Sequence, residues 1–267
     1  MHLQQRFNVR CHGAGDTTLV LAHGYGCDQT MWRLLAPQLS PRYRVITYDL
    51  AGCGAATAAY DQQRHASLHG HAEDALEIIS QFASGAVVFV GHSVAAMIGM
   101  LATIAQPQHF AGQIMIGPSP CFINDGDYVG GYNREDIDGL LQFMLDDYQK
   151  WSDTLGGIIM GTPERPELAQ ELSTRFRAND MAIARHFGRV TFLSDHRADV
   201  PKSTVPALIL QCSDDLIAPR EVGQWLHQHL PNSRIKVVDN QGHCPHFSAP
   251  AASFDIIDGY LSKVLKL

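Results

Sequence analysis

Short apolar runs rich in β-branched and aromatic residues alternate along the chain with amphipathic stretches. The runs cover residues 17–22, 43–48, 87–90, 112–117, 205–212 and 234–238, with a weaker one at residues 6–12. Between them, apolar residues three or four positions apart predict helices at residues 29–39, 68–82, 94–106, 220–229 and 251–265. This alternation of strand and helix predicts an α/β fold with a mainly parallel, doubly wound sheet.

The alternation stops in the middle of the chain. Residues 124–199 contain no convincing strand but show four helical patterns, at residues 134–148, 149–160, 166–176 and 181–193. The segment also holds 14 of the 27 acidic residues. Four helices without an intervening strand are not ordinary crossover connections, so we predict a helical lid over the functional edge of the sheet. Residues 1–123 and 200–267 would then form the core.

A sharp turn follows the run at residues 87–90. Gly91 ends the run, Ser93 stands at the apex, and a helical pattern begins at Val94. This arrangement is typical of a nucleophile elbow, in which the pattern Gly-x-Ser-x-Gly exposes a serine on a strained strand-to-helix turn. Ala95 occupies the position of the second glycine, so the match is imperfect. The alternative is that Ser93 only caps the helix.

Two later strand ends carry the groups that a serine nucleophile needs. Asp215 and His243 follow the runs at residues 205–212 and 234–238, and the order Ser…Asp…His is the one expected of this topology. A neutral imidazole can accept the serine proton, and the carboxylate orients the imidazole. Asp214 and His246 compete for these roles. We favour Asp215 for its place in the loop that ends at Pro219, and His243 because it follows Gly242 directly.

The remaining parts of an acyl-transfer site are donors for the oxyanion. We expect them to be the backbone N–H groups of Val94, which follows the serine, and of Tyr25, which lies in the turn at residues 23–26. The glycines of that turn allow the backbone to approach a ligand. His92 precedes the serine and is expected to line the pocket or to pack beside it.

Composition narrows the class of protein. A formal charge of −7 and a pI near 6.0 argue against binding to nucleic acid. The chain has no apolar run of about 18 residues that would cross a membrane, and its N-terminus does not resemble a signal peptide. The six cysteines are scattered, which favours reduced thiols and a cytoplasmic location.

Three histidines at positions 65, 69 and 71 could suggest a metal site. They stand in a polar stretch, and we find no cysteine or carboxylate at ligand spacing, so a solvated loop is the preferred interpretation. The sequence therefore predicts neither a metal site nor a cofactor.

Taken together, these motifs closely resemble those of the RsbQ-type α/β-hydrolases, which include the bacterial stress-signalling protein RsbQ and the plant strigolactone and karrikin receptors. The resemblance runs over nearly the whole chain and is carried by residues 23–29, 90–94, 117–125, 192–197, 210–215 and 242–246. Two features depart from the family, namely Cys53, where serine is expected, and the loop at residues 55–63.

The resemblance implies an α/β-hydrolase fold with a four-helix, V-shaped lid over a closed hydrophobic pocket. It places the catalytic roles on Ser93, Asp215 and His243, in agreement with the choice made from the residues. The pocket walls that it implies are Tyr25, Phe122, Tyr132, Trp151 and Phe192.

The first hypothesis for function is a cofactor-independent serine hydrolase of small, hydrophobic esters or lactones. The alternative is a ligand-sensing signalling receptor with slow hydrolysis. Its lid would dock a regulatory partner of the phosphatase type in a sigma-factor stress pathway, as the resemblance implies. A binding protein that has lost catalysis is a third and weaker reading, because the triad is intact.

Overall fold

A seven-stranded sheet forms the centre of the molecule, in the order β1-β3-β2-β4-β5-β6-β7. The structure is a computed structural model that describes residues 2–267. β1 runs antiparallel to β3 and all the other neighbours are parallel, which confirms the predicted, mainly parallel sheet. The strands are β1 (Arg10–His12), β2 (Thr17–Ala22), β3 (Arg44–Tyr48), β4 (Ala86–His92), β5 (Phe110–Ile116), β6 (Ala207–Asp214) and β7 (Ser233–Gln241).

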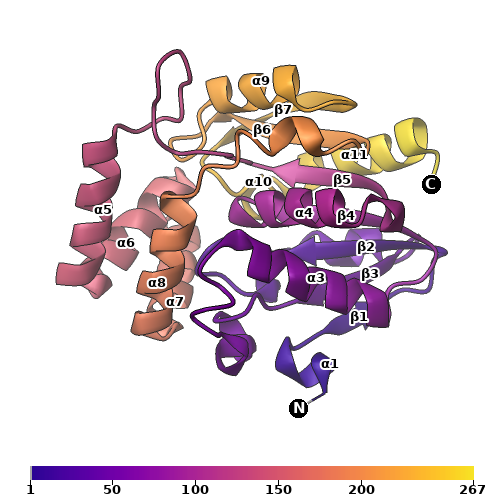
Figure 1. Ribbon diagram of the computed structural model, residues 1–267, viewed down its shortest axis with the longest axis horizontal. Helices are drawn as coiled ribbons and strands as arrows, with labels where there is room; N and C mark the ends of the chain where they lie inside the picture. The colour runs from indigo at the N-terminus through magenta and orange to yellow at the C-terminus, as the bar shows by residue number, and fades with distance from the viewer. Residues whose placement is uncertain (1) are drawn as a thin grey trace.

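Helices cover both faces of the sheet (Figure 1). α3 (Leu68–Phe82), α4 (Val94–Ala105) and α9 (Arg220–His229) bury one face, to which strand residues such as Val20 and Phe89 point. α2 (Ala36–Leu39) and α11 (Pro250–Tyr260) bury the other, to which Leu19 and Val88 point. Central strands buried on both faces explain why the sequence shows continuous apolar runs rather than alternation.

Four helices lie together beyond one end of the sheet (Figure 1). They are α5 (Arg134–Asp146), α6 (Tyr148–Met160), α7 (Pro166–Ala178) and α8 (Met181–Phe192), close to the four predicted patterns. Side chains of α6, α7 and α8 reach the carboxyl ends of β4 and β7, because they share a cavity with Ser93 and His243. The division of the chain into a core and a separate lid unit stays a prediction.

Several elements differ from the sequence prediction. The helix expected at residues 29–39 is a short 3₁₀ turn, η1 (Gln29–Trp32), followed by α2, and the weak strand at residues 6–12 is reduced to β1 after α1 (Leu3–Arg6). The remaining short elements are η2 (Gly54–Ala59), η3 (Pro107–His109), η4 (Val200–Lys202), α10 (Pro245–Ser248) and the π-turn η5 (Leu261–Leu265). Across residues 2–267, helices of the length and apolarity that a bilayer crossing requires are absent.

Candidate active site

The turn between β4 and α4 has the strained geometry expected of a nucleophile elbow. Ser93 has φ 56° and ψ −123°, a conformation that non-glycine residues rarely adopt. Strand and helix leave the turn so close together that a Cβ at Gly91 would lie 2.3 Å from the carbonyl oxygen of Ala95. Glycine is therefore required at position 91, whereas the methyl group of Ala95 is fully buried in the core.

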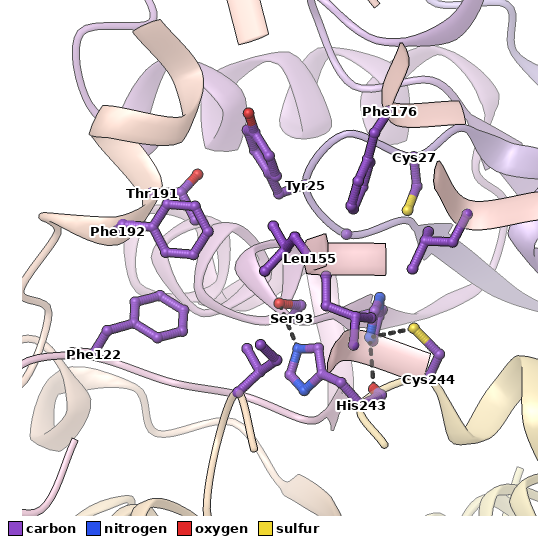
Figure 2. Close-up of a pocket in the computed structure, with 15 residues that line it drawn as sticks. Tyr25, Cys27, Ser93, Phe122, Leu155, Phe176, Thr191, Phe192, His243 and Cys244 are labelled. Atoms are coloured by element: carbon purple, nitrogen blue, oxygen red, sulfur yellow. Dashed lines mark hydrogen bonds between the residues drawn. The ribbon is translucent and has the colours of Figure 1, made fainter. Parts of the chain in front are cut away.

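Three strand ends bring Ser93, His243 and Asp215 into one chain of hydrogen bonds, and Figure 2 shows the one between Ser93 and His243. The Oγ of Ser93 lies 2.8 Å from Nε2 of His243. Nδ1 of His243 lies 2.7 Å from Oδ2 of Asp215. With Nδ1–H donating to the carboxylate, Nε2 carries the lone pair that accepts the serine proton.

The structure separates the two aspartates that the sequence left in competition. Asp215 is buried, and its second oxygen, Oδ1, accepts hydrogen bonds from the backbone N–H groups of Ile217 at 2.9 Å and Ala218 at 3.1 Å. Together with Nδ1–H of His243, these two donors fix the direction of the carboxylate. Asp214 is exposed at the end of β6 and has no contact with His243.

The backbone of His243 is held from two sides. Its N–H donates to the carbonyl oxygen of Ile159 in α6 at 2.7 Å, and its carbonyl oxygen accepts from Nε2 of His92 at 2.9 Å. Burial lowers the pKa of His92 well below its usual value, so this ring is neutral and serves as a fixed donor. His92 thus fixes the backbone of His243 from behind.

His246, the other histidine that competed for the role of base, packs elsewhere. Its ring lies between those of Trp32 and His92, at 4.5 and 4.4 Å. Burial lowers its pKa to about 3. The ring is therefore neutral and does not contact Ser93, so the structure brings His243 and not His246 to the serine.

Two backbone N–H groups remain available near Ser93. Among residues 2–267, the amides of Tyr25 and Val94 take part in none of the backbone hydrogen bonds that close turns and caps. The turn that carries Tyr25 comes very close to the elbow, because a Cβ on Gly24 would lie 2.6 Å from Nδ1 of His92 and 3.4 Å from Cβ of Ser93. The hydroxyl of Tyr25 donates to the carbonyl oxygen of Ala184 in α8 at 2.7 Å, which fixes the turn against the lid helices.

A narrow apolar cavity lies above Ser93 (Figure 2). Its volume is about 30 Å³, room for about two water molecules. Four of the predicted pocket residues, Tyr25, His92, Phe122 and Phe192, line this cavity. A second, outer groove of about 360 Å³ adjoins it, since the two share Leu155, Phe192 and Ile217.

Two predicted wall residues lie elsewhere. Trp151 is fully buried one layer behind the cavity, where its ring stacks on Tyr148 at 5.7 Å and meets the edge of Tyr25 at 6.2 Å. Tyr132 lines the outer groove, and its hydroxyl donates to the carbonyl oxygen of Leu216 at 2.6 Å. The side chains that α6, α7 and α8 place beside Ser93 therefore differ from those that the resemblance implied.

The sequence analysis did not predict the residues of α6 and α7 that line one side of the cavity. Leu155 and Ile159 come from α6, and Leu172 and Phe176 come from α7. Each pair is spaced four residues apart, which marks one face of a helix. That signal identifies an apolar face but does not show that the face points at Ser93.

Two cysteine side chains complete the cavity wall. Burial raises the pKa of Cys27 to about 12 and that of Cys244 well above its usual value. Both thiols are therefore protonated near neutral pH and are poor nucleophiles. Among the described residues that line the cavity, only Ser93 has a hydroxyl bonded to a histidine. The hydroxyl of Thr191 has no hydrogen-bond partner, and that of Tyr25 donates to the carbonyl oxygen of Ala184.

The prediction of a solvated histidine loop at residues 65–71 is wrong for two of the three histidines. His65 and His71 are buried together with Asp74, whereas His69 is exposed. The sequence interpretation overlooked this carboxylate. Because α3 begins at Leu68, Asp74 lies one helical turn after His71 and on the same face.

The sequence of residues 19–256 matches the family described as "Alpha/beta hydrolase family". The chain belongs to this family. The match spans every strand except β1 and includes Ser93, Asp215 and His243. The α/β-hydrolase fold predicted from the sequence is thereby confirmed.

Relatives of this alpha/beta hydrolase carry both receptor and esterase names. It is 37% identical to karrikin insensitive 2 receptor IA of Petunia hybrida, over 98% of this chain and 97% of that protein. It is 34% identical to strigolactone esterase D14 of Arabidopsis thaliana, over 94% of each. A solved hydrolase from Oleispira antarctica superimposes with a TM-score of 0.94 at 35% identity, covering 97% of this chain and 96% of its own. The resemblance to RsbQ itself stays a prediction.

Proposed function

We propose that this alpha/beta hydrolase is a serine hydrolase of small, hydrophobic esters or lactones. The observation that carries the proposal is the 2.8 Å contact between Oγ of Ser93 and Nε2 of His243. A serine hydroxyl becomes a nucleophile when a base accepts its proton, and here that base is already within hydrogen-bonding distance.

The proposed reaction has two halves. Ser93 attacks the carbonyl carbon while His243 takes its proton, and the tetrahedral oxyanion is held by the N–H groups of Tyr25 and Val94. His243 then gives the proton to the leaving alcohol, which leaves an acyl group on Ser93. Water activated by His243 releases the acid. Asp215 keeps the imidazole in its tautomer and stabilises the imidazolium that forms twice per cycle.

The cavity supports a small and apolar substrate. Phe122, Phe176 and Phe192 surround the space above Ser93, and Leu155 limits it (Figure 2). Because no charged side chain except the triad reaches the space among the described residues, a charged acyl group would lose its hydration without a partner. An acetyl ester fits these walls better than a long-chain one.

Turnover of p-nitrophenyl acetate tests the proposal directly. We expect Ser93→Ala to lower kcat by roughly 10⁴- to 10⁶-fold, because the nucleophile is lost. Ser67→Ala, at an exposed serine, is the control and should leave turnover unchanged. Equal turnover in wild type and Ser93→Ala would reject Ser93 as the nucleophile.

A second candidate function is ligand sensing with slow hydrolysis. The identity of 37% with a protein named as a karrikin receptor favours it. The lid also exposes apolar side chains to which a regulatory protein of the phosphatase type could bind, namely Leu145, Ile158 and Met181, which are 52%, 38% and 51% exposed. Binding of such a partner would depend on the conformation of the lid.

Purification from the native cell separates the two functions. A receptor is expected to retain a regulatory protein in stoichiometric amount, and to retain it in Ser93→Ala as well if binding of the ligand suffices. A simple hydrolase is expected to purify alone and to turn over its ester many times. We place either activity in the cytoplasm, because all six cysteines are unpaired.

A further inference from the structure

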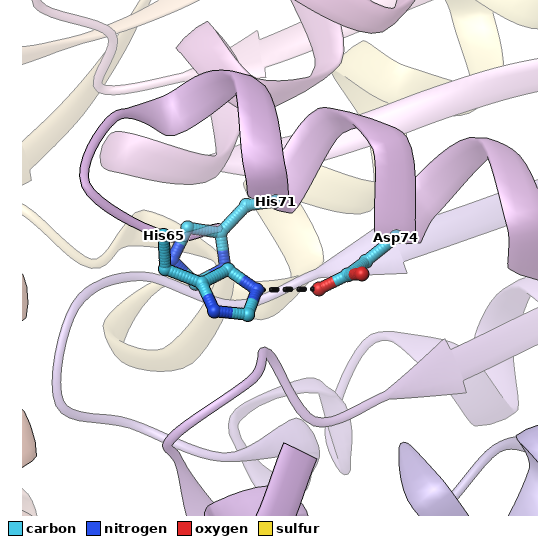
Figure 3. A group of neighbouring side chains, drawn as sticks. All are labelled: His65, His71 and Asp74. Carbon is cyan, nitrogen blue, oxygen red and sulfur yellow. Dashed lines mark hydrogen bonds and ion pairs between the residues drawn. The ribbon is translucent and has the colours of Figure 1, made fainter. Parts of the chain in front are cut away.

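Two buried histidines and one buried aspartate meet beneath α8, outside the cavity above Ser93 (Figure 3). His65 comes from the loop before α3, while His71 and Asp74 stand one turn apart on α3 itself. One nitrogen or oxygen atom from each of the three side chains lies within 4.8 Å of the others. Three groups of the kind that hold metal ions are therefore gathered in one place.

Within this cluster, His71 is the residue whose polar atoms have no partner. Its ring is 1% exposed, and neither ring nitrogen has a hydrogen-bond partner within residues 2–267. A buried polar group without a partner destabilises the folded state, and most such groups in native proteins are paired. The ring is enclosed by His65 and by Phe187 of α8, each with its centroid at 4.5 Å.

His65 has the orientation of a metal-binding histidine. Its Nδ1 lies 2.8 Å from the carbonyl oxygen and 3.0 Å from the backbone nitrogen of Asp61, and its Nε2 lies 2.8 Å from Oδ2 of Asp74. Metal-bound histidines commonly donate one ring N–H to a backbone carbonyl and bind the ion through the other nitrogen. In that tautomer Nε2 carries a lone pair, and an ion bound there would replace the hydrogen bond that now joins Nε2 to Oδ2 of Asp74.

Asp74 is also held in place from behind. Nε of Arg64 donates to its Oδ1 at 3.0 Å, so that only Oδ2 is turned toward the histidines. A carboxylate fixed in this way by a hydrogen bond from outside the site is a usual feature of metal centres.

We propose that His65, His71 and Asp74 bind a divalent transition-metal ion of the Zn²⁺ type. Two imidazoles exclude the oxygen-binding ions Ca²⁺ and Mg²⁺ and suit Zn²⁺, Co²⁺, Ni²⁺ or Cu²⁺. Ligand atoms around one Zn²⁺ lie about 3–4 Å apart at bond lengths near 2.0–2.2 Å. The present separations, from 2.8 Å to at most 4.8 Å, enclose that range, so a small rotation of the rings completes the site.

The metal would have a structural role. The ring of Tyr60 stacks on His65 at 4.8 Å, and its hydroxyl is hydrogen-bonded to Nδ1 of His186 in α8 at 2.6 Å. Phe187 of the same helix covers His71. An ion that fixes the two histidine rings therefore fixes the surface on which the lid helix rests, without contact with the reacting ester.

Binding of Co²⁺ to chelator-treated protein without a polyhistidine tag tests the proposal. We expect the wild type to bind one Co²⁺ per chain, with a visible absorption band and a rise in Tm. His65→Gln and His71→Gln should each weaken binding more than about 10-fold, because each removes a ligand. His69→Gln is the matched control and should bind as the wild type does, because His69 is exposed. Far-UV circular dichroism and ester turnover report whether the variants fold.

Two outcomes overturn the proposal. One is a wild type that binds no Co²⁺ or Zn²⁺. The other is binding that is lost in His69→Gln and retained in His71→Gln. That result would place the ion at the surface, between His69 and His196, whose rings are 5.9 Å apart. If the His71 variant does not fold, crystals of the wild type with Zn²⁺, measured at the zinc absorption edge, decide. An anomalous peak between the three side chains supports the site, and its absence rejects it.

Discussion

Two adjacent aspartates at the end of β6 provide a test substitution and its control. Asp215 is buried and bonded to His243, whereas Asp214 is exposed. We expect Asp215→Asn to lower kcat for p-nitrophenyl acetate by roughly 10⁴-fold, because an amide favours the wrong imidazole tautomer. Asp214→Asn should change kcat less than about 2-fold, since surface substitutions usually have small effects. The reverse order would assign the acid to Asp214.

Gly91 and Gly139 form a second pair, which tests stability. A Cβ at Gly91 would meet backbone atoms at 2.3 and 2.5 Å, whereas one at Gly139 in α5 would meet nothing within 4 Å. Gly91→Ala should lower the free energy of unfolding by about 1–3 kcal/mol, because overpacked backbone must shift. Gly139→Ala should raise it by up to about 1 kcal/mol through helix propensity. Urea unfolding measures both, and unchanged stability of Gly91→Ala would contradict the close approach of β4 and α4.

Some residues were predictable because topology alone places them. The ends of parallel strands meet at one edge of a sheet, so Ser93, Asp215 and His243 could be expected to lie together once three strands were recognised. The cluster of His65, His71 and Asp74 could not be predicted in this way. Its burial depends on the contact of α8 with the loop before α3, and no spacing in the sequence reports that long-range contact.

At the scale of elements, the apolar face of α6 controls the size of the cavity. Leu155 separates the narrow cavity from the outer groove, whereas Ile158 on the same helix lines only the groove. Leu155→Ala should therefore raise the rate with p-nitrophenyl hexanoate relative to acetate. It should also lower the free energy of unfolding by about 2–5 kcal/mol, because it removes buried methyl groups.

Chain-length profiles of the two variants measure this effect. Ile158→Ala is the control, and its ratio of hexanoate to acetate turnover should equal that of the wild type. A Leu155→Ala enzyme that folds but keeps the wild-type ratio would show that Leu155 does not limit the acyl group.

The mispredicted elements have two kinds of cause. Some depend on a local residue, and others depend on contacts between distant parts of the chain. Pro37 has no N–H to donate, so a helix cannot run unbroken through residues 29–39, and the structure begins α2 at Ala36 instead. The positions of Tyr132 and Trp151 depend on how α5 and α6 are rotated about their axes. Periodicity gives the apolar face of each helix, but it does not show which part of that face meets the cavity and which part meets a neighbouring helix.

At the scale of the whole molecule, buried histidines tie stability to pH. Burial lowers the pKa of His23, His71, His92 and His246 below the usual value. An unfolded chain binds protons at these groups below about pH 6.5, whereas the folded chain does not. The stabilisation is therefore complete above pH 6.5 and is lost as the pH falls toward the folded-state pKa values, at most by about 1.4 kcal/mol per group and pH unit.

Urea unfolding of metal-free protein at pH 7.5 and 5.5 measures this loss. The four groups together should lower the free energy of unfolding by up to about 5 kcal/mol between these values. His246→Phe removes one of the four without touching Ser93, so it should reduce the loss by roughly 1.4 kcal/mol. Equal stability at the two pH values would mean that these rings take up protons inside the fold.

The hydrogen bond from the N–H of His243 to the carbonyl oxygen of Ile159 has a consequence for control. It joins the catalytic base to the last turn of α6, so that a displacement of this helix also displaces the imidazole from the serine. If α6 and His243 move together, a contact that stabilises one position of α6 also stabilises the matching position of the His243 imidazole, by the same coupling free energy. A protein that binds the outside of this helix would then change the affinity of the site for its ligand, and the ligand would change the affinity for that protein by the same factor. Ligand binding and partner binding would then depend on the same conformational equilibrium of α6.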